Sequence, residues 1–219
     1  MAVLPILKYP DPKLRQVAKE VTVFDNQLAI LAKNMLETMI SAQGVGIAAP
    51  QVGESLSMFL VNFGSSKEVL PEEVVVFVNP KVLEHSGTID SEEGCLSVEG
   101  LRANVTRAQR LKIMAQDLDG QPFTYEFEDH DSIVIQHELD HLTGKLFIDH
   151  LSFLKREMYD KSLKQARKKK EKEEKKAASQ KTFEEMNERS PATESQLVDN
   201  LDQGAQSGPP DSDSGEPAI

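Results

Sequence analysis

One short segment constrains this chain more than any other, because it places His137 and His141 four positions apart with Glu138 beside the first. In an α-helix, residues i and i+4 lie on one face about one turn apart, so both imidazoles can reach a single cation. Catalytic sites of the zinc type usually use three protein ligands and keep one position for water. The segment therefore predicts a metal-binding helix and requires a third ligand from elsewhere in the chain.

Cys95 is the strongest candidate for the third ligand. It is the only cysteine in the chain, so it cannot be half of an intramolecular disulfide, and a thiolate is a strong ligand for zinc or ferrous iron. A free cysteine is commonly a small buried hydrophobe, but Gly94 and the polar residues before it indicate a bent and exposed backbone. A single cysteine also indicates a reducing compartment.

An acidic third ligand beyond the helix is the alternative, and it would make the site similar to that of a thermolysin-like protease. The candidates are Asp149, Glu157 and Asp160, and none is distinguished by its neighbours. The remaining histidines lack a partner at ligand spacing, so we interpret them as surface or hydrogen-bonded residues, with His130 in place of Cys95 as a minority alternative: His85, His130 and His150.

The segment from Gly44 to Gly53 is the third unusual feature. Gly44 and Gly46 allow the backbone to approach another group closely or to adopt a positive φ angle. No Lys-Ser or Lys-Thr pair follows, so the segment is not a phosphate-binding loop. Gln51 has its one uncharged hydrogen-bonding side chain, whose amide can donate to a developing oxyanion.

The chain contains three motifs in order: Gly44-x-Gly46-Ile47-Ala48-Ala49-x-Gln51, Glu93-Gly94-Cys95-Leu96-Ser97 and Gln136-His137-Glu138-x-x-His141. Together they resemble the signature motifs of bacterial peptide deformylases. The resemblance extends from about Pro5 to about Leu154 and leaves the carboxy-terminal segment uncovered.

The resemblance implies a metal-dependent hydrolase that removes the formyl group from N-formyl-methionyl nascent polypeptides and releases formate. Cys95, His137 and His141 would hold one divalent metal, with Fe²⁺ favoured and Zn²⁺, Ni²⁺ or Co²⁺ as other occupants. Metal-bound hydroxide would attack the formyl carbon, with Glu138 as general acid/base.

The resemblance also implies how the substrate is held. The side-chain amide of Gln51 and the backbone N–H of Leu96 would stabilise the tetrahedral intermediate. The nascent peptide would lie extended beside Gly46 and the strand after Leu96, with Arg102 as a basic residue near it.

The chain departs from the family pattern in two places. Glu99 stands where the family commonly has proline, which adds a charge near the peptide groove. His130 stands where an aliphatic wall of the methionine pocket is usual, in the polar run Asp129–Ser132. This run predicts a helix N-cap, with Asp131 or Ser132 accepting from the first turn.

The sequence predicts an α+β fold, with short antiparallel β-strands grouped around a central metal-binding helix. We expect helices at Asp11-Pro12, over about 25–42, and over about 132–143 ending at Gly144. The expected strands are 58–62, 74–79, 81–89, 101–106, 111–117 and 123–127, with Asp119-Gly120 as a hairpin turn.

Composition divides the chain into three parts. Residues 1–160 form the predicted catalytic domain, because apolar segments recur only there. Residues 161–176 hold nine Lys/Arg and three Glu, a basic charged extension of a carboxy-terminal helix. Residues 177–219 hold two Lys/Arg and nine Asp/Glu and form an acidic low-complexity tail of disordered composition.

The basic segment 161–176 has two interpretations. It could extend the contact that the carboxy-terminal helix of this family makes with the ribosome, or it could be a solvated charged helix. The resemblance and the absence of a membrane span or signal peptide predict a cytoplasmic monomer with no membrane partner. Two other functions remain open: a metalloprotease that cleaves internal peptide bonds, and a metal-stabilised, ribosome-associated binding module.

Overall fold

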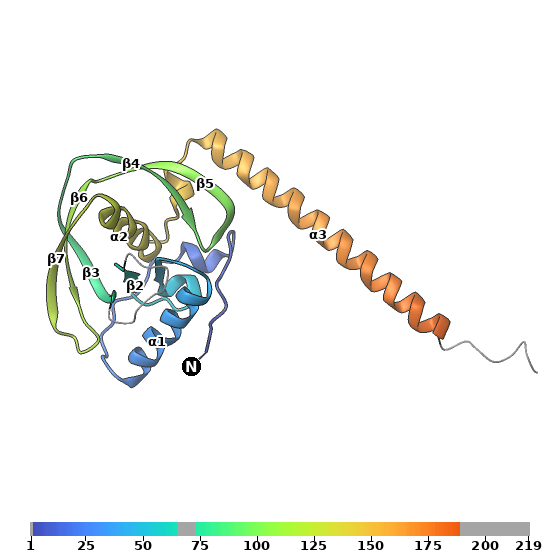
Figure 1. The fold of residues 1–219 in the computed structure, drawn as a ribbon, viewed down its shortest axis with the longest axis horizontal. Helices are drawn as coiled ribbons and strands as arrows, with labels where there is room; N and C mark the ends of the chain where they lie inside the picture. Colours follow the sequence, from blue (N-terminus) through green and yellow to red (C-terminus); the bar gives the residue numbers. More distant parts are fainter. Residues whose placement is uncertain (1, 65–72, 189–219) are drawn as a thin grey trace, which may run out of the picture. The chain divides into compact units, whose positions relative to one another are not determined.

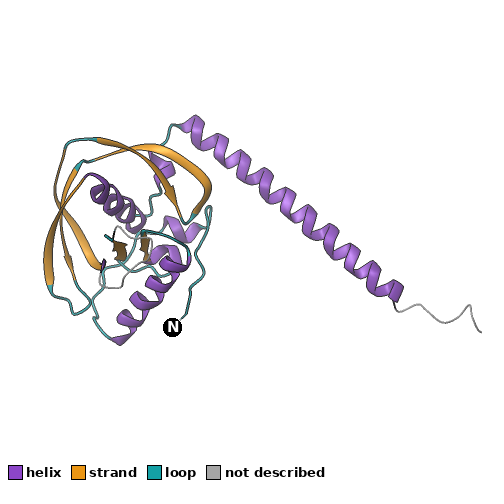
Figure 2. Ribbon diagram, viewed as in Figure 1, coloured by secondary structure: helices purple, strands orange, loops and turns teal. Residues whose placement is uncertain are grey.

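A computed structural model describes residues 2–64 and 73–188 of the chain. The chain divides into two compact units, Met1–Lys161 and Ser162–Ile219. Within the first unit, five strands form one antiparallel sheet in the order β1-β2-β3-β6-β7, and β4 and β5 form a second, two-stranded sheet. The helix α2 lies inside the ring of curved strands (Figures 1 and 2). The predicted α+β class, with antiparallel strands around a central helix, is confirmed.

The elements are bounded as follows. The helices are α1 (Asn26–Ser41), α2 (Asp129–Leu142) and α3 (Phe153–Glu188), with short 3-10 turns η1 (Pro12–Arg15), η2 (Ala49–Val52) and η4 (Phe147–His150). The strands are β1 (Gly46–Ala48), β2 (Met58–Asn62), β3 (Val74–Ser86), β4 (Ile89–Cys95), β5 (Val98–Arg107), β6 (Arg110–Gln116) and β7 (Pro122–Glu128).

The core consists of two layers on opposite faces of the five-stranded sheet. Strand β2 shows this most clearly, because alternate residues of a strand point to opposite faces. Met58 and Leu60 pack in the layer that contains Met35 and Met39 of α1. Phe59 packs in the other layer, which contains residues of α2. The helix α2 is therefore held against one face of the sheet, and α1 covers the other face.

The predicted strand boundaries were wrong in two regions. The segments 74–79 and 81–89 form mainly one strand, β3, which bends through an irregularity between Val78 and Lys81 while Asn79 adopts a φ of 50°. The Asn79 side chain compensates by hydrogen bonding both the N–H and the C=O of Val21, each at 2.8 Å. Strands β1 and β4 were not predicted, because β1 lies in a glycine-rich segment and β4 is rich in acidic residues.

The start of α2 differs from the predicted N-cap. The helix begins at Asp129, and its N-cap residue Glu128 makes no side-chain capping bond. The Ser132 hydroxyl donates instead to the carbonyl of Ala108 at 2.9 Å. The cap prediction at Asp131 or Ser132 was therefore wrong, because the hydroxyl fastens the first turn of α2 to the connection between β5 and β6.

The carboxyl end of α2 is set by Gly144, as predicted. Gly144 has a φ of +72°, and a Cβ at this position would lie 2.4 Å from the carbonyl oxygen of Arg15. Only glycine combines this left-handed backbone with such a close approach. The end of α2 therefore lies close against the backbone of the turn η1.

The helix α3 continues past Lys176, where the predicted helical extension ends, and is helical to Glu188. Alanine, lysine, glutamine and glutamate favour helix in this stretch. Residues 177–188, which were predicted as part of the acidic tail, belong to α3, and residues 189–219 lie outside the described part. Among the described helices, none combines the length and apolar character needed to cross a membrane.

Candidate active site

Three potential metal ligands converge from two elements. Cys95 ends β4, and His137 and His141 lie one turn apart on α2. One donor atom from each lies within 4.8 Å of the others, and Cys95 Sγ is 3.3 Å from His141 Nε2. A cation with bonds of about 2.0–2.3 Å to one sulfur and two nitrogens fits this set. Among the side chains that the structure describes, this is the one such cluster of His, Cys, Asp or Glu.

Glu93 orients one of the ligands. Its carboxylate lies 2.8 Å from Nδ1 of His137. A carboxylate accepts hydrogen bonds, so Nδ1 carries the proton and the Nε2 lone pair is free for a metal. Burial alone would raise the pKa of Glu93, but hydrogen bonds from Arg107 and His137 outweigh burial and lower the pKa to about 2. Glu93 is therefore ionised in the folded protein at neutral pH.

Arg107 balances the buried charge of Glu93. Its guanidinium donates two hydrogen bonds to the Glu93 carboxylate, at 2.7 and 2.9 Å. A third hydrogen bond, of 2.7 Å, goes to Asp140, whose carboxylate is also 2.7 Å from His150. Arg107 and Glu93 are both 6% exposed. This chain of charges links α2 to β4, β5 and η4.

Glu138 lies beside the ligands and is almost fully buried, with 4% of its surface exposed. Burial raises its pKa to about 7. Among the described residues, its Oε2 is one of few buried side-chain oxygens without a hydrogen-bond partner. Gly46 makes room for it, because a Cβ there would lie 2.5 Å from Glu138 Oε1. A buried carboxylate near neutral pKa suits a proton-transfer group.

Gln51 is held from the other side of the metal-ligand cluster. It is 1% exposed, and its Oε1 accepts a 2.8 Å hydrogen bond from the N–H of Ala48. This bond directs Nε2 toward Cys95 Sγ at 3.6 Å and Ser97 Oγ at 3.2 Å. The amide thus presents donors beside the thiolate.

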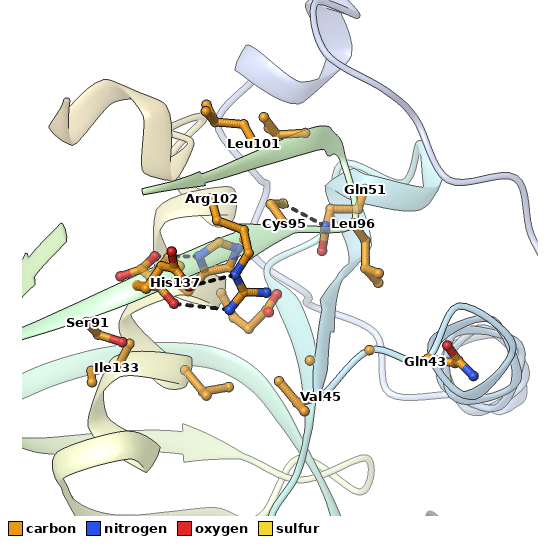
Figure 3. A pocket seen from close by; sticks show the side chains of 18 of the residues that line it. Gln43, Val45, Gln51, Ser91, Cys95, Leu96, Leu101, Arg102, Ile133 and His137 are labelled. Atoms are coloured by element: carbon orange, nitrogen blue, oxygen red, sulfur yellow. Dashed lines mark hydrogen bonds and ion pairs between the residues drawn. The ribbon is translucent and has the colours of Figure 1, made fainter. Parts of the chain in front are cut away.

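A cavity of about 700 Å³ opens beside these groups. Its lining includes most of the residues predicted from the sequence: Gly46, Gln51, Cys95, Leu96, Arg102, His137 and Glu138. Figure 3 shows Gln51, Cys95, Leu96, Arg102 and His137 around the opening. His141 is buried, at 1% exposure, and is not among the residues that line the cavity. Arg102 is exposed and pairs with Glu92 at 3.1 Å. The structure therefore gathers the predicted residues at one place.

Sequence reasoning missed the supporting residues Glu93 and Arg107. Glu93 was part of a quoted motif but received no role, and Arg107 lies far from any motif. In the antiparallel register of β4 and β5, Glu93 lies opposite Ala103 and Arg107 lies opposite Ile89, so the two side chains pair without being directly opposed. The one available signal was an acidic residue two positions before the only cysteine.

Comparison with known proteins identifies the family. A sequence model described as polypeptide deformylase matches residues 3–157. The chain belongs to the polypeptide deformylase family. A peptide deformylase of Desulfotalea psychrophila is 46% identical over 164 residues, which cover 75% of this chain and 96% of the relative.

Solved structures agree with this assignment to the deformylase family. A peptide deformylase from Legionella pneumophila superposes with a TM-score of 0.70 at 41% identity, over 77% of this chain and 98% of that chain. A Met-Ala-Ser-bound class I type b peptide deformylase from Acinetobacter baumannii gives 0.64 at 36% identity, over 68% and 99%.

Membership makes this chain a metal-dependent hydrolase that removes N-terminal formyl groups from polypeptides, as predicted. The protease alternative required an acidic ligand from beyond α2. Each of the three candidates is engaged elsewhere: Asp149 with Arg15, Glu157 with Lys161, and Asp160 with Tyr9.

Proposed function

We propose that Glu138, Gln51 and Leu96 carry out deformylation of N-formyl-methionyl nascent peptides, beside one divalent metal held by Cys95, His137 and His141. The observation that supports this most is the buried Glu138 carboxylate, whose Oε2 lacks a hydrogen-bond partner while its pKa is raised to about 7. Such a group can take a proton from water and return it to a leaving amine.

Ferrous iron is the proposed physiological metal, and zinc, nickel or cobalt can occupy the same donors. One thiolate and two imidazoles suit each of these ions. Which metal occupies the site therefore depends on its availability in the cell as much as on its affinity. When bound, the metal polarises the formyl oxygen and lowers the pKa of water to about 7. With iron, oxidation of the Cys95 thiolate would remove a ligand.

Three groups of the chain act on the substrate. Glu138 accepts the proton of the attacking water and then protonates the amine as the formyl C–N bond breaks. The Gln51 amide and the Leu96 N–H donate to the oxygen that becomes negative. The peptide lies extended between Gly46 and the β5 side of the cavity, where backbone hydrogen bonds tolerate many side chains. Arg102 lies at the rim of this cavity.

Replacing Gln51 tests the oxyanion part of this proposal. Gln51→Glu keeps an oxygen that can accept from the Ala48 N–H and removes both amide donors. We expect kcat to fall about 10²–10³-fold, because that is the usual effect of losing one oxyanion donor. Metal content and the melting temperature are measured in parallel, with Gln51→Ala as a second, uncharged variant. If both variants keep wild-type kcat, Gln51 has no role in the reaction.

A contact between the basic part of α3 and ribosomal RNA is the proposed partner interaction. The segment 161–176 is strongly basic, and binding to phosphates would weaken with salt. We expect a chain ending after Asp160 to lose co-sedimentation with ribosomes at low salt. The full chain with Lys168, Lys169 and Lys170 changed to glutamine is the matched variant, because it keeps the helix length. Undiminished binding by both variants contradicts the contact.

The proposed cellular setting follows from this function. The nascent peptides that the protein would act on are present in the cytoplasm. A single cysteine also suits a reducing compartment. A monomer suffices, because the proposed catalytic residues all come from one chain.

A further inference from the structure

The cavity extends beyond the reacting groups along one face of α2. His130, Ile133, Val134 and His137 all line it, and their spacing of three, four and seven positions places them on one helical stripe. At about 1.5 Å per residue, His130 lies about 10 Å along the helix axis from His137. The helix that provides two metal ligands therefore also provides a wall that ends in a polar residue.

The first side chain of the substrate should occupy this part of the cavity. Six bonds separate the formyl carbon of formyl-methionine from its terminal methyl group, and at about 1.5 Å each they span about 7 Å when extended. With the formyl group beside His137, the thioether passes Ile133 and Val134, and its end approaches His130. This step rests on the proposed function, because it places the formyl group at Glu138.

The far part of the cavity is more polar than a methionine side chain requires. Ser91 of β4 lines the cavity together with His130 and Ile133, and Figure 3 draws Ser91 and Ile133 on the side of the opening away from Gln51 and Leu96. A hydroxyl and an imidazole N–H are both hydrogen-bond donors. A thioether sulfur is a weak acceptor, whereas oxidation to the sulfoxide makes this flexible apolar side chain polar. The sulfoxide oxygen supplies the acceptor that these donors can use.

We propose that His130, assisted by Ser91, is a specificity-determining residue that extends deformylation to peptides beginning with formyl-methionine sulfoxide. The reaction is the same hydrolysis: water adds across the formyl C–N bond, giving formate and the free amine, and the sulfoxide is unchanged. His130 donates a hydrogen bond to the sulfoxide oxygen. With ordinary formyl-methionine, the same imidazole only contacts the terminal methyl group.

The test compares kcat/KM for three peptides that differ in the first side chain: formyl-Met-Ala-Ser, its methionine sulfoxide form, and the norleucine form as an apolar isostere. In His130→Leu, we expect the ratio of sulfoxide to norleucine activity to fall about threefold to tenfold, as losing one hydrogen bond implies. The kcat/KM for the norleucine peptide should itself rise in this variant, because leucine extends the apolar wall. His85→Leu is the matched control, since His85 lies on β3 and does not line this cavity.

The outcomes separate this inference from the proposed function. If the wild-type protein releases formate from formyl-Met-Ala-Ser but its sulfoxide-to-norleucine ratio is the same in His130→Leu, His130 does not determine specificity. If the ratio falls equally in His85→Leu, the effect is not local and the inference is also wrong. If no formate is released from any peptide by the metal-loaded wild-type protein, the proposed function fails.

Discussion

Glu138→Gln is expected to lose about 10²–10⁴-fold in kcat, the usual contribution of a positioned general acid/base. The amide has the size of the carboxylate but cannot take a proton from water at neutral pH. The environment supports this role, because burial raises the Glu138 pKa to about 7. The measurement is formate release from formyl-Met-Ala-Ser by the metal-loaded variant.

Metal content is the control for this variant. Glu138 is not among the three clustered ligands, so the variant should bind metal in the same ratio as the wild-type protein. It should also fold, because Glu138 Oε2 has no hydrogen-bond partner to lose. A variant that holds metal and keeps wild-type kcat would show that another group moves the proton.

The second large effect is expected on stability, from Arg107→Met. The substitution leaves the Glu93 carboxylate, which is 6% exposed, without its bidentate partner. Removing one partner of a buried ion pair typically costs about 3–5 kcal/mol of unfolding free energy. Because Glu93 orients His137, metal affinity should also fall by about 10–100-fold. Denaturant unfolding and metal titration measure the two effects.

Two further variants make this prediction specific. Arg102→Met removes an arginine from the same strand. The Arg102–Glu92 pair is exposed, at 65% and 60%, so the loss of unfolding free energy should stay within about 1 kcal/mol. The double variant Arg107→Met with Glu93→Gln removes both buried charges and should regain part of the stability. Equal losses of unfolding free energy in Arg107→Met and Arg102→Met would contradict a special role for the buried Arg107–Glu93 pair.

The candidate metal ligands could be predicted from the sequence, because they depend on short spacings along the chain and on a single cysteine. His137 and His141 lie on one face of any helix that contains them, and Cys95 had no competing thiol. The prediction of α1 succeeded for a similar reason: Asp25 caps it by accepting from the N–H groups of Gln27 and Leu28. Local capping chemistry and helical periodicity were sufficient in these cases.

The parts that the sequence did not predict depend on contacts between distant segments. Arg107 of β5 hydrogen bonds Glu93 of β4 and Asp140 of α2, and neither contact leaves a periodic signal in the sequence. Gly46 was read as part of a loop, but it belongs to a three-residue strand whose close approach to Glu138 requires glycine. Ser132 resembled an N-cap, yet its hydroxyl bonds Ala108 on a distant connection. In each of these cases, contacts with residues distant in the sequence determined the local structure.

The measurement that tests the central claim most directly compares two bonds in one assay. The metal-loaded protein is incubated with formyl-Met-Ala-Ser and with an unformylated peptide that contains internal bonds. We predict formate and free Met-Ala-Ser in equal amounts from the first peptide and no cleavage of the second. Cleavage of internal bonds without release of formate would contradict the account and would favour a metalloprotease instead.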